Sequence, residues 1–272
     1  MTPLFRSRAR GRALTYAYAR RIGVRLSLLL SASLGLMGCA FLRSASVPME
    51  RVAFREAGPD KARGAIVLLP GFGDRPAAFE ENGFVAALAR RAPSYDVFGA
   101  DAHFGYYRKR TVIDRLEQDV IGPLRARGYR EIWLMGASMG GLGAVAYTRT
   151  HPERIRGVML FAPYMGPQEV VREVAAVGLC KYLPPAQNND DEARLARENF
   201  RWLRQQACED RKVSLWLGVG SEDRLKRPDS VLANALDPTH VLILPGGHGW
   251  KVWTPAVDRL AQTAFDTIEA MH

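Results

Sequence analysis

A single serine stands among glycines in the stretch LMGASMGG at positions 134–141. The pattern Gly-x-Ser-x-Gly, from Gly136 to Gly140, is typical of a nucleophilic serine on a sharp strand-to-helix turn, where small neighbours prevent clashes. The apolar run before Ser138 favours a strand, and the spacing of apolar residues after it favours a helix. We therefore interpret Ser138 as a candidate nucleophile; a small residue in an ordinary tight turn is the alternative.

A serine hydroxyl is a weak nucleophile and needs a base that is itself oriented by an acid. His248, in LPGGHGW, follows the last predicted strand, and Asp223, in SEDRL, follows the strand before it. The carboxyl ends of parallel strands meet at one edge of a sheet, where Ser138 is also expected. We predict His248 as the base and Asp223 as the acid, with Glu222 as the alternative acid.

Four other histidines are weaker candidates for the base. His151 lies near the far end of the helix that follows Ser138, His240 begins a strand at the opposite edge, and His272 is the last residue. His103 follows a predicted strand at the correct edge. We therefore interpret His103 as a candidate substrate contact and retain His248 as the base.

The elements that must position these residues alternate between short apolar strands and helical patterns. Such alternation predicts an α/β fold, a mostly parallel sheet with helices on both faces. The predicted strands are 65–69, 95–99, 131–135, 157–161, 213–219 and 241–244, with 52–55 as an antiparallel edge strand. The predicted helices are 79–91, 112–127, 139–150 and 252–271.

The connection between the strands at 157–161 and 213–219 is too long for one crossover helix. We predict a helical cap, at about 164–211, inserted over one end of the sheet. Its apolar and aromatic residues are expected either to line an acyl or alcohol pocket or to form the cap's own small core. These residues are 161–165, Val170, Val174, Leu179, Tyr182 and Leu183.

The N-terminal segment carries seven arginines and no acidic residue in positions 1–38, and an apolar run at 26–38 precedes Cys39. A basic start and a short apolar run that ends in small residues are typical of a secretory signal. The run is also shorter than the roughly 20 residues of a membrane-spanning helix. We predict a signal peptide at 1–38, a linker at 39–50 and a folded α/β domain that contains the cap at 51–272. The end of the run resembles a bacterial lipoprotein box, which implies lipidation of Cys39 and a membrane-anchored protein that faces the periplasm; an uncleaved signal-anchor is the alternative.

Two further cysteines and the charge distribution limit the other classes of function. An oxidising compartment permits a disulfide between Cys180 and Cys208, with two buried free thiols as the alternative.

Residues 39–272 carry a net charge of only +3 of the total +10, without an interleaved basic and aromatic stripe, so we expect no nucleic-acid partner. Histidines and cysteines do not cluster at ligand spacings and no phosphate-binding glycine motif is present, so we expect no metal and no nucleotide cofactor.

The sequence LPGFGD at 69–74, the Gly136–Gly141 segment and the order Ser138, Asp223, His248 together resemble the α/β-hydrolase-fold serine hydrolases over about residues 50–270. This resemblance implies that backbone N–H groups of Phe72 and Met139 form an oxyanion hole. Many members of the family have His-Gly before the first of these donors, whereas this chain has Pro70-Gly71.

The resemblance further implies an acyl-enzyme mechanism on a small-molecule or lipid-like ester. We therefore expect an exported serine hydrolase of the esterase or lipase type. An acyltransferase or thioesterase with the same triad is the second hypothesis. A membrane-tethered binding protein that kept the fold without the chemistry is the third.

Overall fold

The computed structural model describes residues 43–185, 190–210 and 212–269. The chain divides into two units, Met1–Arg43 and Ser44–His272, and the fold below is that of the second unit. The predicted signal peptide and Cys39 lie outside the described residues. Within the described residues, no helix combines the length and apolar character needed to cross a membrane.

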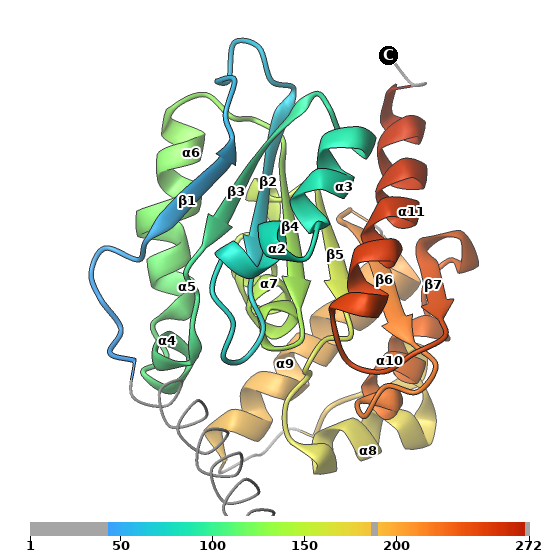
Figure 1. The fold of residues 1–272 in the computed structure, drawn as a ribbon. Coiled ribbons are helices and arrows are strands. Elements are labelled where there is room, and N and C mark those ends of the chain that lie inside the picture. Colours follow the sequence, from blue (N-terminus) through green and yellow to red (C-terminus); the bar gives the residue numbers. More distant parts are fainter. Residues whose placement is uncertain (1–42, 186–189, 211, 270–272) are drawn as a thin grey trace, which may run out of the picture. The chain divides into compact units, whose positions relative to one another are not determined.

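A seven-stranded sheet forms the centre of the Ser44–His272 unit, in the order β1-β3-β2-β4-β5-β6-β7 (Figure 1). All neighbouring strands are parallel except β1, which pairs antiparallel with β3. This arrangement confirms the predicted fold class. The strands are β1 Arg51–Arg55, β2 Gly64–Leu69, β3 Tyr95–Ala100, β4 Ile132–Ala137, β5 Gly157–Phe161, β6 Ser214–Gly220 and β7 Val241–Leu244.

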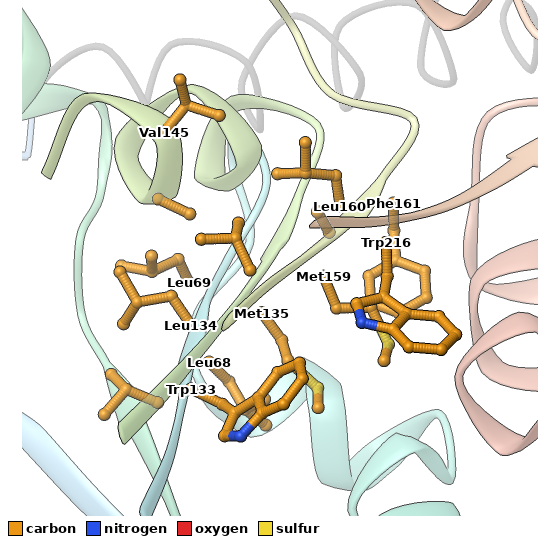
Figure 2. Close-up of a cluster of buried hydrophobic side chains, with 14 of the residues drawn as sticks. Leu68, Leu69, Trp133, Leu134, Met135, Val145, Met159, Leu160, Phe161 and Trp216 are labelled. Carbon is orange, nitrogen blue, oxygen red and sulfur yellow. The ribbon is translucent and has the colours of Figure 1, made fainter. Parts of the chain in front are cut away.

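Helices cover both faces of the sheet, which explains why the strands are nearly continuous apolar runs. The helices α3 (Phe84–Arg91) and α11 (Trp250–Glu269) pack together on one face, while α7 (Met139–Thr150) packs on β4 and β5 from the other (Figure 1). Every residue of β2, β3, β4 and β5 is buried. Figure 2 shows part of this core, in which large side chains such as Trp133, Met135 and Phe161 fill the space around the central strands. Burial of each such side chain stabilises the fold by about 1.5–3 kcal/mol.

Two helices differ from the sequence-based expectation. The segment 79–91 is not one helix but two, α2 (Ala77–Glu81) and α3, because Gly83 adopts a left-handed conformation with φ 76° and ends the first. The segment 112–127 contains α5 (Val112–Arg115), a π-helical stretch Leu116–Ile121 and α6 (Gly122–Ala126). The short helices α4 (Phe104–Arg108) and α10 (Lys226–Ala233) have no counterpart in the prediction.

The long connection between β5 and β6 contains α8 (Gln168–Val177), η3 (Leu179–Lys181), α9 (Asp191–Gln205) and the π-helical η4 (Gln206–Asp210). In Figure 1, α8 lies beyond the carboxyl ends of β5 and β6, where it contacts α10, and α9 packs on α7. A disulfide between Cys180 and Cys208, with Cα atoms 5.7 Å apart, joins η3 to η4. Val170, Val174 and Tyr182 belong to the hydrophobic core, whereas Leu183 is 77% exposed.

Candidate active site

Ser138 occupies the turn between the end of β4 and the start of α7. Its φ of 50° and ψ of −114° lie in a region that non-glycine residues rarely adopt, at a cost of about 1–3 kcal/mol. Three backbone hydrogen bonds hold this conformation: the Ser138 N–H donates to the Phe161 carbonyl, and the Ser138 carbonyl accepts from the N–H groups of Gly141 and Tyr164. The turn is therefore fixed by its neighbours on β5 and the loop that follows.

The glycines on either side of Ser138 are required by close backbone contacts. A Cβ atom on Gly136 would lie 2.3 Å from the carbonyl oxygen of Gly140. A Cβ on Gly140 would lie 2.0 Å from the carbonyl oxygen of Leu69, at the end of β2. Side chains cannot be accommodated at such distances without moving the backbone, which explains the Gly-x-Ser-x-Gly pattern.

The structure brings Ser138, His248 and Asp223 together at the carboxyl edge of the sheet. The Nε2 atom of His248 is 2.9 Å from Ser138 Oγ, and Nδ1 is 2.9 Å from each carboxylate oxygen of Asp223. A carboxylate only accepts hydrogen bonds, so Nδ1 carries the proton and Nε2 is the acceptor for the serine hydroxyl. This arrangement suits transfer of the hydroxyl proton to Nε2.

The three side chains are shielded from water. Asp223 is completely buried, and the side chain of His248 is only 6% exposed. The N–H of Leu225 donates a further hydrogen bond of 2.7 Å to Asp223 Oδ1, which fixes the carboxylate. Trp253, from the first turns of α11, packs against the imidazole of His248 at an angle of 85° with ring centroids 5.1 Å apart. The base is thereby held between an acid and an aromatic ring.

A second aspartate, Asp229 on α10, lies near this site. It is buried, and burial together with the negative charge of Asp223 raises its pKa to about 8. Neither of its carboxylate oxygens has a hydrogen-bond partner among the described residues. Asp229 was not singled out in the sequence because an aspartate near a helix start usually faces solvent, and no local signal indicates its burial. Trp253 was also missed, for the same lack of a local signal.

The two candidate oxyanion donors come from two segments close to Ser138, the start of α7 and the loop after β2. Met139 is the first residue of α7, and the first N–H groups of a helix have no acceptor within the helix. Phe72 lies in the loop after β2, and its ring contacts Phe104 edge-on. The loop passes close to the nucleophile, since a Cβ on Gly71 would be 3.5 Å from Ser138 Cβ. Burial also raises the pKa of Asp74 in this loop.

The remaining sequence candidates lie elsewhere. Glu222 is exposed, and its neighbour Asp223 contacts the imidazole instead. His103 is buried, and its Nδ1 accepts a hydrogen bond from the N–H of Gly105 as the N-cap of α4. His151 stacks on Tyr147 at the far end of α7, and His240 stacks on Trp216. Among the residues that the structure describes, no group of His, Cys, Asp or Glu could hold a metal ion.

Residues 60–214, more than half of the chain, match the model of the family Hydrolase_4, described as serine aminopeptidase, S33. None of the curated proteins matches the chain. Three solved structures are similar in fold. One is Est1E from Butyrivibrio proteoclasticus with bound ferulic acid (TM-score 0.53, 14% identity, 82% of this chain and 96% of that chain). The second is a ferulic acid esterase, with a TM-score of 0.52 and 15% identity over 80% of this chain and 98% of that chain. The third is the S-formylglutathione hydrolase FrmB of Staphylococcus aureus, with a TM-score of 0.51 and 14% identity over 81% of this chain and 97% of that chain.

These structures share too little sequence with the chain to show more than its fold. The family match covers β2 to the start of β6, including the Ser138 turn, and the sheet order and helical layers agree with it. The chain therefore belongs to the Hydrolase_4 family of α/β hydrolases, the family described as serine aminopeptidase, S33.

Proposed function

We propose that the protein is a serine hydrolase that cleaves carboxylic esters through an acyl-enzyme intermediate. The observation that carries this proposal is the continuous hydrogen-bonded chain from Ser138 Oγ through the His248 imidazole to the Asp223 carboxylate. A serine on a strained turn, with a base 2.9 Å away that is itself oriented by a buried acid, is the arrangement that activates a hydroxyl for attack on a carbonyl. The names of two of the similar structures, a ferulic acid esterase and an S-formylglutathione hydrolase, agree with this chemistry.

In the first half of the reaction, Ser138 Oγ forms a bond to the carbonyl carbon as its proton passes to His248 Nε2. The tetrahedral intermediate then loses the alcohol, which leaves with the proton from Nε2. Asp223 keeps Nδ1 protonated and stabilises the imidazolium while it exists. In the second half, water attacks the acyl carbon, His248 takes its proton, and Ser138 leaves with that proton restored.

The negative charge that develops on the carbonyl oxygen needs donors in place before the reaction. We assign this role to the backbone N–H of Met139, which is free of an intrahelical acceptor, and to that of Phe72 in the adjacent loop. Each well-placed donor in a water-poor site stabilises the transition state by about 3–4 kcal/mol. The positive end of the α7 dipole adds to this effect.

A fluorophosphonate probe tests the proposed nucleophile directly. We expect it to label the folded protein at Ser138 and to leave the Ser138→Ala variant unlabelled. Ser138→Ala and His248→Ala should each lower the turnover of p-nitrophenyl butyrate by at least about 10⁴-fold, because the residues act as a unit. An aminoacyl p-nitroanilide serves as the amide comparison. Faster turnover of the amide than of the ester, or full ester activity in Ser138→Ala, would contradict the proposal.

We further propose that the protein is exported and carries lipid on Cys39. The basic and apolar composition of residues 1–38, which end in Leu-Met-Gly before the cysteine, supports this assignment. Lipid attachment would place the catalytic unit at a membrane surface in the cell envelope. Metabolic labelling with a radioactive fatty acid should mark the full-length protein and not its Cys39→Ala variant; equal labelling of both would exclude Cys39 as the site.

A further inference from the structure

A cavity of about 920 Å³ lies between α8, α10 and the loop that contains Asp223. Its volume is at the upper end of the range for small-molecule sites in proteins, about 300–1,000 Å³. Of the triad, Asp223 lines the cavity, and Tyr164, which also lines it, donates its backbone N–H to the Ser138 carbonyl. It therefore lies on the acid side of the triad and is linked to the nucleophile turn through Tyr164.

Much of the wall of this cavity is apolar. Met165, Val171, Leu179 and Val231 line it and are themselves buried, and they come from four different segments of the chain. Val177, at the end of α8, also lines the cavity and is 50% exposed, which extends the apolar surface towards solvent. A hydrocarbon chain is the ligand group that such walls favour, at about 0.8 kcal/mol per buried methylene in general.

The mouth of the cavity is cationic. Three of the residues that line it, Lys181, Arg224 and Arg227, are exposed. Many other arginines of the domain form ion pairs with acids, but this lysine and these two arginines have no ion-pair partner among the described residues. Two carboxylates line the same cavity, the exposed Glu222 and the buried Asp223, so these three cations exceed them by one. Unpaired guanidinium and ammonium groups around an apolar cavity favour an anionic group.

We propose that this cavity binds an anionic amphiphile, a molecule with a hydrocarbon chain and a carboxylate or phosphate group. The chain enters between α8 and α10, and the anionic group contacts Lys181, Arg224 and Arg227 at the mouth. As a subsite for the substrate this inference rests on the proposed ester hydrolysis, and it specifies the substrate class as an ester of an anionic, lipid-like molecule. The binding itself does not depend on turnover.

Direct binding is measured by isothermal titration calorimetry on the Ser138→Ala protein, below the micelle concentration of each probe. Dodecyl phosphate and laurate are the anionic probes, one for each head group, and dodecyl maltoside is the neutral probe. We expect the anionic probe that matches the natural head group to bind at least about tenfold more tightly than dodecyl maltoside, and its affinity to fall with added salt. Equal affinity for anionic and neutral probes, or no binding of either anion, would overturn the proposal.

Variants separate the cationic mouth from the apolar interior. The double variant Lys181→Gln/Arg227→Gln should weaken binding of the anionic probe about tenfold, because each lost charge-assisted contact lowers affinity. Arg172→Gln is the matched control, since Arg172 is an exposed arginine of α8 that does not line the cavity. Ala175→Trp, at an exposed position that lines the cavity, should weaken the binding of anionic and neutral probes alike. Unchanged binding in both cavity variants would overturn the assignment to this cavity.

The link to catalysis is tested in the active enzyme. Dodecyl phosphate or laurate should inhibit hydrolysis of p-nitrophenyl laurate competitively, with an inhibition constant about tenfold higher in Lys181→Gln/Arg227→Gln. If the anion bound the cavity but did not inhibit ester hydrolysis, the cavity would still be a binding site, but its role as a substrate subsite would be overturned. A protein that binds the anion but hydrolyses no ester would instead contradict the proposed function, so the two failures are distinguishable.

Discussion

Gly140 and the carbonyl group of Leu69 approach each other so closely that a Cβ on the glycine would lie 2.0 Å from the carbonyl oxygen. This contact joins the nucleophile turn to the end of β2 and to the loop that carries Phe72. The three nearest atoms, the carbonyl carbon and oxygen of Leu69 and the carbonyl oxygen of Pro70, all belong to the backbone, so a side chain here can be accommodated only if the turn or the loop moves.

We therefore expect Gly140→Ala to lower the free energy of unfolding by about 1–3 kcal/mol and to lower fluorophosphonate labelling of Ser138 strongly. Urea unfolding and labelling rates measure the two effects. Gly249→Ala is the matched control, because Gly249 lies beside His248 but a Cβ there would meet no atom within 4 Å. If the two alanine variants behaved alike, the close contact would not constrain the turn.

Asp223, and not its neighbour Glu222, should orient the base. Asparagine at position 223 presents an N–H₂ group to Nδ1 and favours the imidazole tautomer in which Nε2 carries the proton and cannot accept one from Ser138. We expect Asp223→Asn to lower kcat for p-nitrophenyl butyrate by about 10³–10⁴-fold. Glu222→Gln should stay within about twofold of the parent, because Glu222 is exposed and it is Asp223 that bonds His248 Nδ1. The reverse ranking would reassign the acid.

Much of this site is predictable from the sequence because its signals are local. The glycine spacing around Ser138 follows from backbone contacts within a strand, a turn and a helix. The positions of Asp223 and His248 follow from the rule that loops at the carboxyl ends of parallel strands share one edge. The fold class is predictable for the same reason, since strands buried on both faces must be apolar throughout.

The features that the sequence did not indicate depend on packing between distant segments. Apolar residues continue through Phe79 and Phe84, so the periodicity predicts one helix, although Gly83 between them ends α2. The two phenylalanine rings contact each other across the break, at a centroid distance of 5.1 Å. The burial of Asp229 and the cavity between α8 and α10 likewise arise from helix packing, for which the local sequence carries no pattern.

The disulfide Cys180–Cys208 should contribute substantially to stability. It closes a loop with a sequence separation of 28 residues around α9, for which the chain-entropy relation gives about 3–4 kcal/mol. We expect the Cys180→Ser/Cys208→Ser variant to unfold at a correspondingly lower urea concentration. The oxidised parent treated with a reductant should match it, and the variant itself should not respond to the reductant. A parent whose unfolding is insensitive to reduction would contradict this contribution.

Asp229 should make the fold less stable as the pH rises. Burial raises its pKa in the folded protein to about 8, whereas in the unfolded chain the group ionises near pH 4. Between these values the folded state binds a proton that the unfolded state has lost, so the free energy of unfolding decreases by at most about 1.4 kcal/mol per pH unit and then levels off above pH 8. The Asp229→Asn variant lacks this titration. The difference in the free energy of unfolding, variant minus parent, should therefore increase steadily from pH 5 to pH 8. Urea unfolding at each pH measures the difference, with Asp60→Asn, an exposed aspartate, as the control. Parallel stability curves for parent and Asp229→Asn would mean that Asp229 is already ionised in the fold, and its buried oxygens would then require a partner.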